Sequence, residues 1–394
     1  MQIPLTLINN TAFALSVDTC GIRVPLAPAS QETRTVTVPG NTAMPVSGTL
    51  RGRDFSIAVD AGSRLAQKRE FDYAIDDLLN LYQHLAADTG GGLAAMTLHF
   101  GPPFSSTNWM GQLDLSADPT LADITLPGTH DTATWGATRD SKCQTLDLAN
   151  QLRAGIRWFD LRLAVSGDDL RIWHGSERQD VYLARDLLPV IKTFLDTHPT
   201  ETVVLCATNV SWSFDYDAFD GQLHRLLMAG VTPNKLYDRP ACPKVSALAG
   251  CVVLMRTDKE ATFGLMALNW PDDRKGTVWN DSGSFLYSVQ NAYRFGSDYL
   301  SAKWALIHAQ LECARLRQDG AGWYVNFTSA SRAPITDPVD IAINENQHGM
   351  NYLLHGYLCQ QIGPQYFGTL PIDFPEAPSG LIKLLISMNK LKPG

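Results

Sequence analysis

Two histidines of this chain each follow a short apolar segment at which a strand is expected to end. His130 lies after the alternating run 124–126 and precedes Asp131, whereas His174 directly follows the run 170–173. Imidazole gains and loses a proton near pH 7, which suits it to proton transfer. A single histidine in such a place is more often a loop or capping residue, so each candidate depends on what accompanies it.

Asp160 and Arg162 lie two residues apart in the apolar run 156–165. Successive side chains of a strand point to opposite faces, so the carboxylate and the guanidinium share one face, while Phe159 and Leu161 lie on the other. Two interpretations remain open. The pair is either a structural ion pair inside the fold or a clamp for phosphate, because arginine presents a planar fork of donors to phosphoryl oxygens.

Three successive apolar segments therefore deliver His, Asp or Arg side chains. In α/β barrels the active site is assembled at the C-terminal ends of the strands. This repeated placement favours one shared site over separate structural roles.

The region after residue 121 alternates predicted strands and helices, which is typical of a parallel sheet or barrel. The clearest unit is a helix over 186–197, broken at 198–200 and followed by a strand over 202–206. Further strands are predicted over 251–256, 323–328 and 367–372, with a long helix over 298–317. A barrel and a doubly wound sheet both fit, and periodicity does not choose between them.

The first 105 residues have a different character. Short alternating runs such as 33–38 and 55–59, separated by Pro, Gly and Asn, predict a small β-rich domain. One amphipathic helix is expected within 72–85, where apolar side chains recur at helical spacing. These side chains are Ile75, Leu78, Leu79, Tyr82 and Leu85. With a linker at 101–106, the predicted domains are 1–105 and 106–394.

The composition narrows the class of protein. Hydrophobic residues make up 45% and charged residues 18%, which predicts a folded globular chain. The net charge is −8 and no Lys/Arg run is present, which argues against nucleic acid and against strong electrostatic docking to anionic membranes. The start of the sequence shows no signal peptide, so a cytoplasmic location is the default expectation, with secretion open if a leader was removed.

The seven cysteines are scattered and odd in number. They show no Cys-x-x-Cys pair and no metal-ligand spacing, so neither a disulfide framework nor a zinc site is expected. Free, buried thiols are the expected state.

Several of these segments resemble the X region of phosphatidylinositol-specific phospholipases C, in particular the metal-independent bacterial and fungal branch. The resemblance runs in consistent order through roughly residues 108–390. The segments that carry it are 126–132, 155–163, 174–175, 194–201, 252–256, 270–272 and 324–328. It implies a distorted TIM-type barrel, and β-rich extensions are known before the barrel in fungal members.

The resemblance also implies a reaction and roles for residues. The inositol 2-hydroxyl attacks the neighbouring phosphorus, which releases diacylglycerol and leaves a cyclic inositol phosphodiester. His130 would be the general base and His174 the general acid, while Arg162 would stabilise the charge on phosphorus. Asp131 would contact the hydroxyl or Arg162, and Asp373 would orient the base histidine.

No metal or other cofactor is expected, because calcium-using relatives carry an acidic group where Arg162 stands. The alternative is a divalent-cation site at His130, Asp131 and Asp160, as in magnesium-using phosphodiesterases of similar fold.

The predicted substrate contacts are Asp160, Arg256, Asp272 and one of two tyrosines, Tyr287 or Tyr293, which would stack on the inositol ring. Apart from Asp160, each is equally compatible with a surface or barrel-end position.

One departure from the family pattern affects the expected substrate. The bacterial enzymes have a basic residue facing inositol after the strand at 202–207, and this chain has 208–210, Thr-Asn-Val. The identity of the substrate is therefore less determined than the type of reaction.

Aromatic residues follow the same strand, at the expected rim of the site. Trp212 and Phe214, with Trp135 from the His130 loop, are candidates for insertion at a lipid interface. Packing against a neighbouring loop is the alternative.

The predicted function is cleavage of phosphatidylinositol or an inositol-linked glycolipid, with transient contact to a membrane surface. One alternative keeps the barrel and the histidines but acts on a different phosphodiester or a small non-lipid substrate. Another is a catalytically silent module that binds lipid or protein. The presence of all five predicted catalytic residues argues against a silent module.

Overall fold

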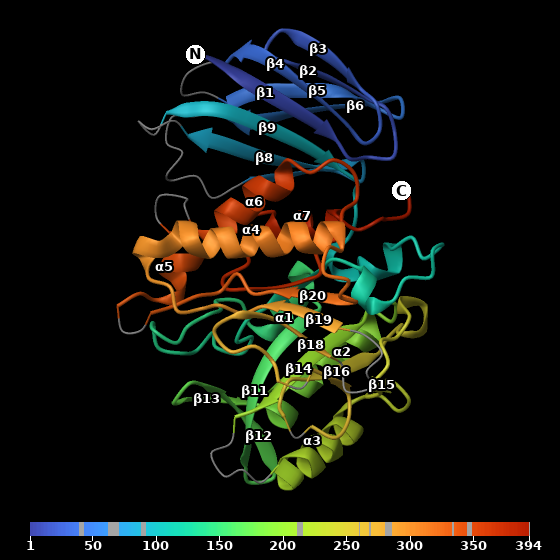
Figure 1. The fold of residues 1–394 in the computed structure, drawn as a ribbon. Helices are drawn as coiled ribbons and strands as arrows, with labels where there is room; N and C mark the ends of the chain where they lie inside the picture. The colour runs from blue at the N-terminus through green and yellow to red at the C-terminus, as the bar shows by residue number, and fades with distance from the viewer. Residues whose placement is uncertain are drawn as a thin grey trace. The chain divides into compact units, whose positions relative to one another are not determined.

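The computed structural model of the protein describes residues 1–38, 43–61, 71–87, 92–210, 216–259, 261–267, 269–279, 286–332, 335–344 and 349–393. The chain forms two compact units (Figure 1). The first comprises Met1–Ser105, Ile343–Gln365 and Glu376–Gly394, and the second comprises Ser106–Ala342 and Tyr366–Pro375.

The first unit contains two β-sheets. One has the order β4 (Ser30–Thr37), β1 (Gln2–Asn9), β9 (Leu93–Gly101), β8 (Leu79–Ala87) and β7 (Asp72–Ile75). The other has the order β3 (Ile22–Leu26), β2 (Leu15–Thr19), β5 (Ala43–Leu50) and β6 (Arg53–Asp60). Along β1 the buried residues Ile3, Leu5 and Leu7 alternate with more exposed ones, as expected for a strand with one face on a core. Both sheets contribute to one hydrophobic cluster. The predicted β-rich N-terminal region is confirmed.

The helix expected within 72–85 is wrong, because this segment forms the antiparallel strands β7 and β8. Asp76, at φ +46°, lies in the turn that joins them. β8 runs in the middle of its sheet and α6 (Met350–Cys359) contacts it, so the strand is buried on both faces. A strand covered on both faces loses its polar alternation, and its apolar spacing can then imitate a helix.

The predicted barrel region 106–394 also differs from the observed units. α6 and α7 (Leu381–Ser387) belong to the first unit, where they contact each other and α6 contacts β8 and β9. Gly356 allows this close approach, since a Cβ there would lie 2.5 Å from His84 Cε1. Packing between residues about 270 positions apart leaves no local signal, so periodicity could not place these helices.

The second unit is built on a path of strands paired in parallel. Their order is β15 (Leu236–Tyr237), β16 (Val252–Arg256), β14 (Val203–Asn209), β11 (Trp158–Ser166), β10 (Leu126–Thr129), β21 (Thr369–Ile372), β20 (Trp323–Asn326) and β19 (Leu286–Gln290). β18 (Lys275–Trp279) pairs antiparallel with β19, and β17 (Leu265–Met266) pairs with β16. Within the described ranges no ladder joins β18 to β15, so the barrel is open on that side. The predicted distorted TIM-type barrel is confirmed.

Helices connect the strands of this barrel. They are α1 (Leu148–Ala154), α2 (Leu188–Thr197), α3 (Tyr216–Gly230), α4 (Leu300–Leu316) and α5 (Pro338–Ala342). β12 (Asp169–His174) and β13 (Glu177–Tyr182) form an antiparallel extension of β11. In the part of the chain that the structure describes, no helix combines the length and the apolar character needed to cross a membrane.

Candidate active site

A cavity of about 230 Å³ lies in the second unit, where several strands of the barrel end. Its lining includes His130, Arg162, His174, Asp373, Cys143 and Tyr293. The structure thus brings together residues from five elements or the loops that follow them.

The pairing of two neighbouring strands places the first two of these residues. β10 and β21 run parallel, and Thr129 at the end of β10 lies opposite Ile372 at the end of β21. His130 and Asp373 each follow by one residue, so they meet at the same edge of the sheet. His130 Nδ1 lies 2.8 Å from Asp373 Oδ1, and the Asp373 side chain is 1% exposed.

Asp131 is the centre of the site. Its carboxylate lies 2.9 Å from Arg162 Nε, 3.1 Å from His174 Nε2 and 3.2 Å from His130 Nε2. Its backbone has φ +41°, a conformation that costs a non-glycine residue about 1–3 kcal/mol. The N–H of Asp131 donates to Asp160 Oδ2 at 3.2 Å, which helps to hold this conformation.

Arg162 points from β11 into the cavity on the same face as Asp160, as the period of two predicts. Arg162 Nη2 lies 3.5 Å from Asp160 Oδ2 and 3.0 Å from His130 Nε2. Arginine only donates hydrogen bonds, so in the neutral form of His130 Nε2 accepts from Arg162 and Nδ1 carries the proton donated to Asp373. In that form the ring has a free-base nitrogen at Nε2.

A proton added at His130 Nε2 would have a partner in place. The nitrogen would stop accepting from Arg162, and its new N–H lies 3.2 Å from the Asp131 carboxylate. Both protonation states of His130 are therefore supported by neighbouring groups, which is what a general base requires.

His174 reaches the cavity by a different route from the one expected. β12 pairs antiparallel with β11, with Leu163 opposite Ile172, so His174 does not end a parallel barrel strand. The extension instead turns back and returns His174 toward the middle of β11. Among the described residues, the buried Nδ1 of His174 has no hydrogen-bond partner.

The charges of the site shift its titrations. Burial alone would lower the pKa of His130, but Asp131 and Asp373 outweigh it and the net shift is upward. For Asp131 the pull of Arg162 and the two histidines overcomes burial and holds the pKa well below its usual range. Burial raises the pKa of Asp373, against the opposing effect of His130.

Two of the predicted substrate contacts do not reach this cavity. Arg256 is 1% exposed and pairs with Asp220 at 2.6 Å and with Asp258. Its guanidinium is committed to a buried ion cluster, so it is not an inositol contact in this structure. Tyr287 is fully buried, with its ring 5.9 Å from the ring of Trp323.

Tyr293 does line the cavity, and its hydroxyl donates to Asp272 Oδ1 at 2.9 Å. Of the predicted rim residues, Trp135 is half-buried. Trp212 and Phe214 lie outside the described residues. At the departure from the family pattern, Thr208 Oγ1 bonds Thr257 Oγ1.

Three residues of the site carry no signal that sequence reasoning used. Gln144 Nε2 donates to the carbonyls of His130 at 2.7 Å and Ile372 at 3.0 Å, which ties together the ends of β10 and β21. Lys303 is fully buried, donates to the carbonyls of Ala292 and Phe327, and has its pKa lowered to about 7, chiefly by burial. Cys143 lines the cavity. None of the three residues stands in a recognisable sequence motif, so only the folded structure shows which groups surround it.

The described residues contain three side-chain groups with the spacing of metal ligands: His130/Asp131/Asp160, His130/Cys143/Asp373 and Asp131/Cys143/His174. The first is the predicted alternative cation site. Arg162 contacts both of its carboxylates, so a cation there would have to displace a guanidinium.

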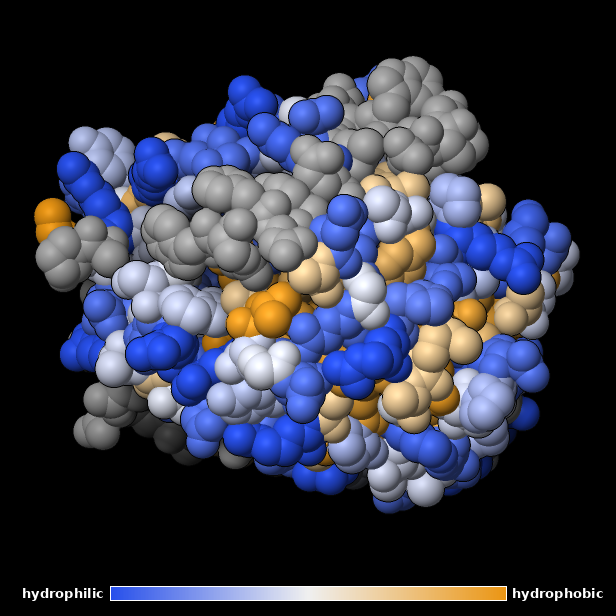
Figure 2. Space-filling model, turned by 90° about the horizontal axis from the view of Figure 1, so that it is seen from below, coloured by the Kyte–Doolittle hydropathy of each residue, from blue (hydrophilic) through white to orange (hydrophobic). Residues whose placement is uncertain are grey.

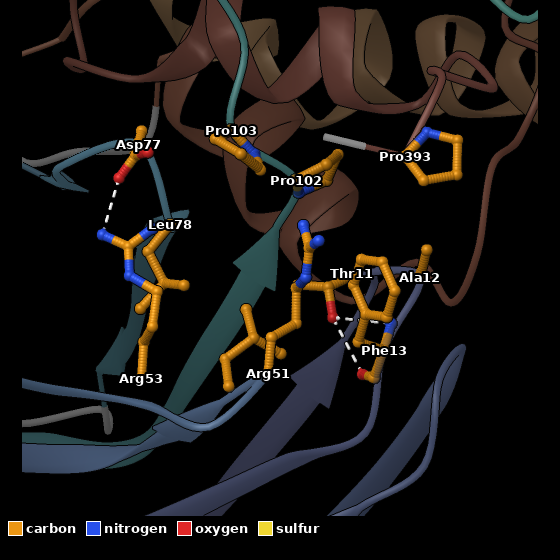
Figure 3. Close-up of a pocket in the computed structure, with 11 residues that line it drawn as sticks. Thr11, Ala12, Phe13, Arg51, Arg53, Asp77, Leu78, Pro102, Pro103 and Pro393 are labelled. Atoms are coloured by element: carbon orange, nitrogen blue, oxygen red, sulfur yellow. Dashed lines mark hydrogen bonds and ion pairs between the residues drawn. The ribbon is translucent and has the colours of Figure 1, made fainter.

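A second cavity, of about 370 Å³, lies in the first unit (Figure 3). Arg53 pairs there with Asp77 at 2.7 Å, and the Arg51 guanidinium lies 4.5 Å from the centre of the Phe13 ring. The described lining contains no histidine or cysteine, so this cavity lacks the side chains of the candidate site.

Comparison with known proteins shows which sequences and structures this chain resembles. Residues 117–235 match the PI-PLC X 1 family. The chain is 27% identical over 254 residues to the 1-phosphatidylinositol phosphodiesterase of Staphylococcus aureus (strain Newman), covering 58% of this chain and 76% of that protein. It is 28% identical over 338 residues to PI-PLC X domain-containing protein 1 of Mus musculus, covering 73% of this chain and 88% of that protein.

Solved structures share the fold. A phosphatidylinositol-specific phospholipase C variant from Staphylococcus aureus aligns with a TM-score of 0.60 at 23% identity, covering 73% of this chain and 98% of that one. The enzyme from Listeria monocytogenes aligns with a TM-score of 0.56 at 22% identity, covering 73% and 100%. Residues 117–235 thus match the PI-PLC X 1 family, and the chain is similar in sequence and in fold to phosphatidylinositol-specific phospholipases C.

Proposed function

We propose that this protein cleaves phosphatidylinositol, or an inositol-linked glycolipid, by intramolecular phosphoryl transfer. The observation that carries the proposal is the arrangement of His130, His174 and Arg162 around the Asp131 carboxylate, with all three side chains lining the cavity. The relatives named as phosphatidylinositol phosphodiesterases support the choice of substrate.

The proposed chemistry starts at His130. Its neutral Nε2 takes the proton of the inositol 2-hydroxyl while that oxygen attacks phosphorus, and Asp373 stabilises the imidazolium that forms. Arg162 stabilises the added negative charge on the phosphoryl oxygens, an effect worth roughly 10²–10³ in rate per donor. His174 donates a proton to the departing glycerol oxygen, so the P–O bond to glycerol breaks as the new P–O bond to inositol forms.

We propose that access to the lipid involves brief contact with a membrane surface. On the face drawn in Figure 2, hydrophobic residues lie in several small groups separated by hydrophilic ones, which does not suggest a broad membrane-binding surface. Ile335 offers a more local contact. It is 75% exposed, in the loop between the cavity-lining residues Ser331 and Pro338.

The test is phosphorus NMR of the protein with phosphatidylinositol micelles and excess chelator. A five-membered cyclic phosphodiester signal is expected. His130→Ala and His174→Ala should each reduce turnover by roughly 10²–10⁴-fold without unfolding the barrel. A variant with near wild-type turnover would contradict the acid–base assignment, and activity restored only by calcium or magnesium would contradict the role of Arg162.

A further inference from the structure

Cys143 is held beside the proposed base by two backbone hydrogen bonds. Its N–H donates to Thr134 Oγ1 at 3.1 Å, and its carbonyl accepts from the N–H of Phe374 at 3.0 Å. The second bond ties the Cys143 loop to the residue that follows Asp373. The thiol is fully buried in the protein wall and lines the cavity.

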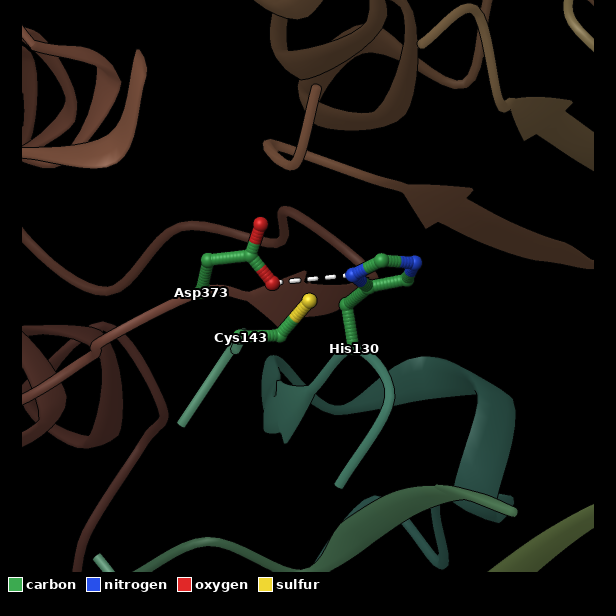
Figure 4. A group of neighbouring side chains, drawn as sticks. All are labelled: His130, Cys143 and Asp373. Carbon is green, nitrogen blue, oxygen red and sulfur yellow. Dashed lines mark hydrogen bonds and ion pairs between the residues drawn. The ribbon is translucent and has the colours of Figure 1, made fainter. Parts of the chain in front are cut away.

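Figure 4 shows the sulfur beside the line that joins Asp373 to the His130 ring. One ligand atom from each of His130, Cys143 and Asp373 lies within 4.8 Å of the other two. Zinc bonds to S, N and O of roughly 2.0–2.3 Å imply ligand separations of roughly 3.3–3.8 Å in a tetrahedral site. Shifts of the side-chain ligand atoms by about 1 Å would therefore bring their separations into the range of a tetrahedral zinc site.

The charge and the chemistry of the donors favour a soft cation. The three carboxylates Asp131, Asp160 and Asp373 exceed the positive charge of the site when the histidines are neutral. Arg162 is the guanidinium that pairs with the first two, and burial lowers the pKa of Lys303, whose amine interacts with Asp373, to about 7. A thiolate with an imidazole and a carboxylate is a donor set that suits Zn²⁺ rather than Mg²⁺ or Ca²⁺, which prefer oxygen ligands. Arg162 pairs with Asp131 and Asp160, so its guanidinium obstructs the all-oxygen side of the site.

We propose that His130, Cys143 and Asp373 form an inhibitory site for a soft divalent cation, with Zn²⁺ as the type ion and water as its fourth ligand. The inhibitory role rests on the proposed function, whereas metal binding at these three side chains does not depend on it. Binding replaces the thiol proton, which leaves to solvent, with a sulfur–zinc bond. It also commits an imidazole nitrogen of His130 and the carboxylate that supports it, so His130 can no longer act as a base. The enzyme would then need no metal for catalysis and yet be inhibited by zinc.

The binding test uses Co²⁺ as a spectroscopic probe on the full-length protein, followed by competition with Zn²⁺. One equivalent should bind and give the thiolate-to-cobalt charge-transfer absorption, which Zn²⁺ then displaces. Cys143→Ser should abolish the absorption and weaken Zn²⁺ binding by roughly 100-fold or more. Cys206→Ser is the matched control. Cys206 is a buried thiol of β14, opposite Asp160 of β11, and it belongs to none of the groups of metal-ligand spacing among the described residues.

Two further variants separate the alternatives. His174→Ala should keep the absorption, because His174 belongs to the other group that shares Cys143. Loss of the absorption in His174→Ala, or its persistence in Cys143→Ser, would overturn the proposed ligands.

Inhibition is measured separately, as the ratio of rates with and without Zn²⁺ for each variant. The wild type and Cys206→Ser should be inhibited and recover on chelation, whereas Cys143→Ser should resist at the same Zn²⁺ concentration. Cobalt binding through Cys143 in a protein without phosphodiesterase activity would refute the proposed function and leave the metal site intact. Activity without any thiolate absorption would refute the metal site alone.

Discussion

Asp373 controls the proton affinity of His130 through one hydrogen bond of 2.8 Å. The carboxylate favours the protonated imidazole, and together with Asp131 it raises the pKa of His130 in spite of burial. A general base must be neutral to accept a proton. Because the pKa of His130 is raised, activity should be lost on the acidic side at a higher pH than it would be with a histidine of ordinary pKa.

Asp373→Asn should therefore move the acidic limb of the kcat/KM profile to lower pH, because the amide keeps the hydrogen bond but loses the charge. Loss of the support for the imidazolium should also lower kcat, by up to about 10⁴-fold if the carboxylate acts as in a Ser-His-Asp triad. The measurement is a profile over about pH 5 to 8. An unmoved limb would show that another group titrates there.

The residue scale also shows where reasoning from sequence was sufficient. Asp160 and Arg162 share a face because a strand has a period of two, and this local rule holds without knowledge of the fold. The same reasoning left open whether they form an ion pair or a phosphate clamp. The structure shows that the two are compatible, since Arg162 contacts Asp160 and Asp131 and still lines the cavity.

At the scale of elements, the start of β11 is anchored by a fully buried ion pair. Arg157 donates to Glu201 Oε2 from Nε at 2.9 Å and from Nη2 at 2.7 Å, and both side chains are 0% exposed. Further bonds from Arg157 reach the carbonyls of Leu152 and Ser106. This pair joins the strand that carries Arg162 to the beginning of β14.

Arg157→Met should lower the free energy of unfolding by about 3–5 kcal/mol, because it leaves the Glu201 carboxylate buried without its partner. Arg157→Met combined with Glu201→Met should recover part of that loss. Urea denaturation measures both. Arg153→Met, at an exposed position of α1, is the matched control and should change stability by about 0.5 kcal/mol or less. Equal losses for Arg157→Met and the double variant would show that the pair itself, rather than the stranded charge, matters.

The elements also show the limit of periodicity. β8 was expected as a helix because burial on both faces removes the polar alternation of a strand. β11, β14, β16, β20 and β21 were predicted near their observed bounds, because apolar runs of that length flanked by turn residues and helices are typical of buried parallel strands. The long helix predicted over 298–317 contains the observed α4, Leu300–Leu316.

At the scale of the second unit, each end of the barrel strands carries an exposed apolar side chain. Ile335 follows β20 on the side of the cavity, whereas Leu316 ends α4 before β20 begins, at the opposite end of the strands. Both are exposed, at 75% and 51%.

Ile335→Ser should weaken binding to phosphatidylinositol vesicles by roughly tenfold, since inserting an isoleucine gains roughly 1.5 kcal/mol or more. Activity toward a monomeric short-chain substrate should change little. Leu316→Ser is the control and should leave vesicle binding unchanged, as measured by co-sedimentation. Equal effects of the two substitutions would refute a contact localised at the cavity end.

At the scale of the first unit, two buried histidines make the fold sensitive to acid. His99 Nδ1 donates to the carbonyl of Cys359, while its Nε2 accepts from Asn10, so the ring is held neutral. Burial lowers the pKa of His99 to about 4 and that of His355 to about 3, from an unfolded value of about 6.5.

Between pH 6.5 and about 4 the unfolded state binds more protons than the folded one, so stability is present above pH 6.5 and is lost as the pH falls. The expected loss between about pH 7.5 and 5 is roughly 2 kcal/mol per histidine. His355→Leu should flatten this dependence in urea unfolding, whereas His308→Leu, at an exposed position of α4, should not. An unchanged slope in His355→Leu would refute the assignment.

The sequence by itself determined the type of fold, the barrel strands and the catalytic candidates, because these depend on local periodicity and on a motif that spans most of the barrel. Tertiary structure alone decided the rest. His174 reaches the cavity through an antiparallel extension, and Arg256 is buried in an ion cluster. The helices α6 and α7 belong to the first unit, and Cys143 lies beside His130 and Asp373. Each of these depends on contacts between residues far apart in the chain, and no spacing within one segment records which distant side chain will lie across from it.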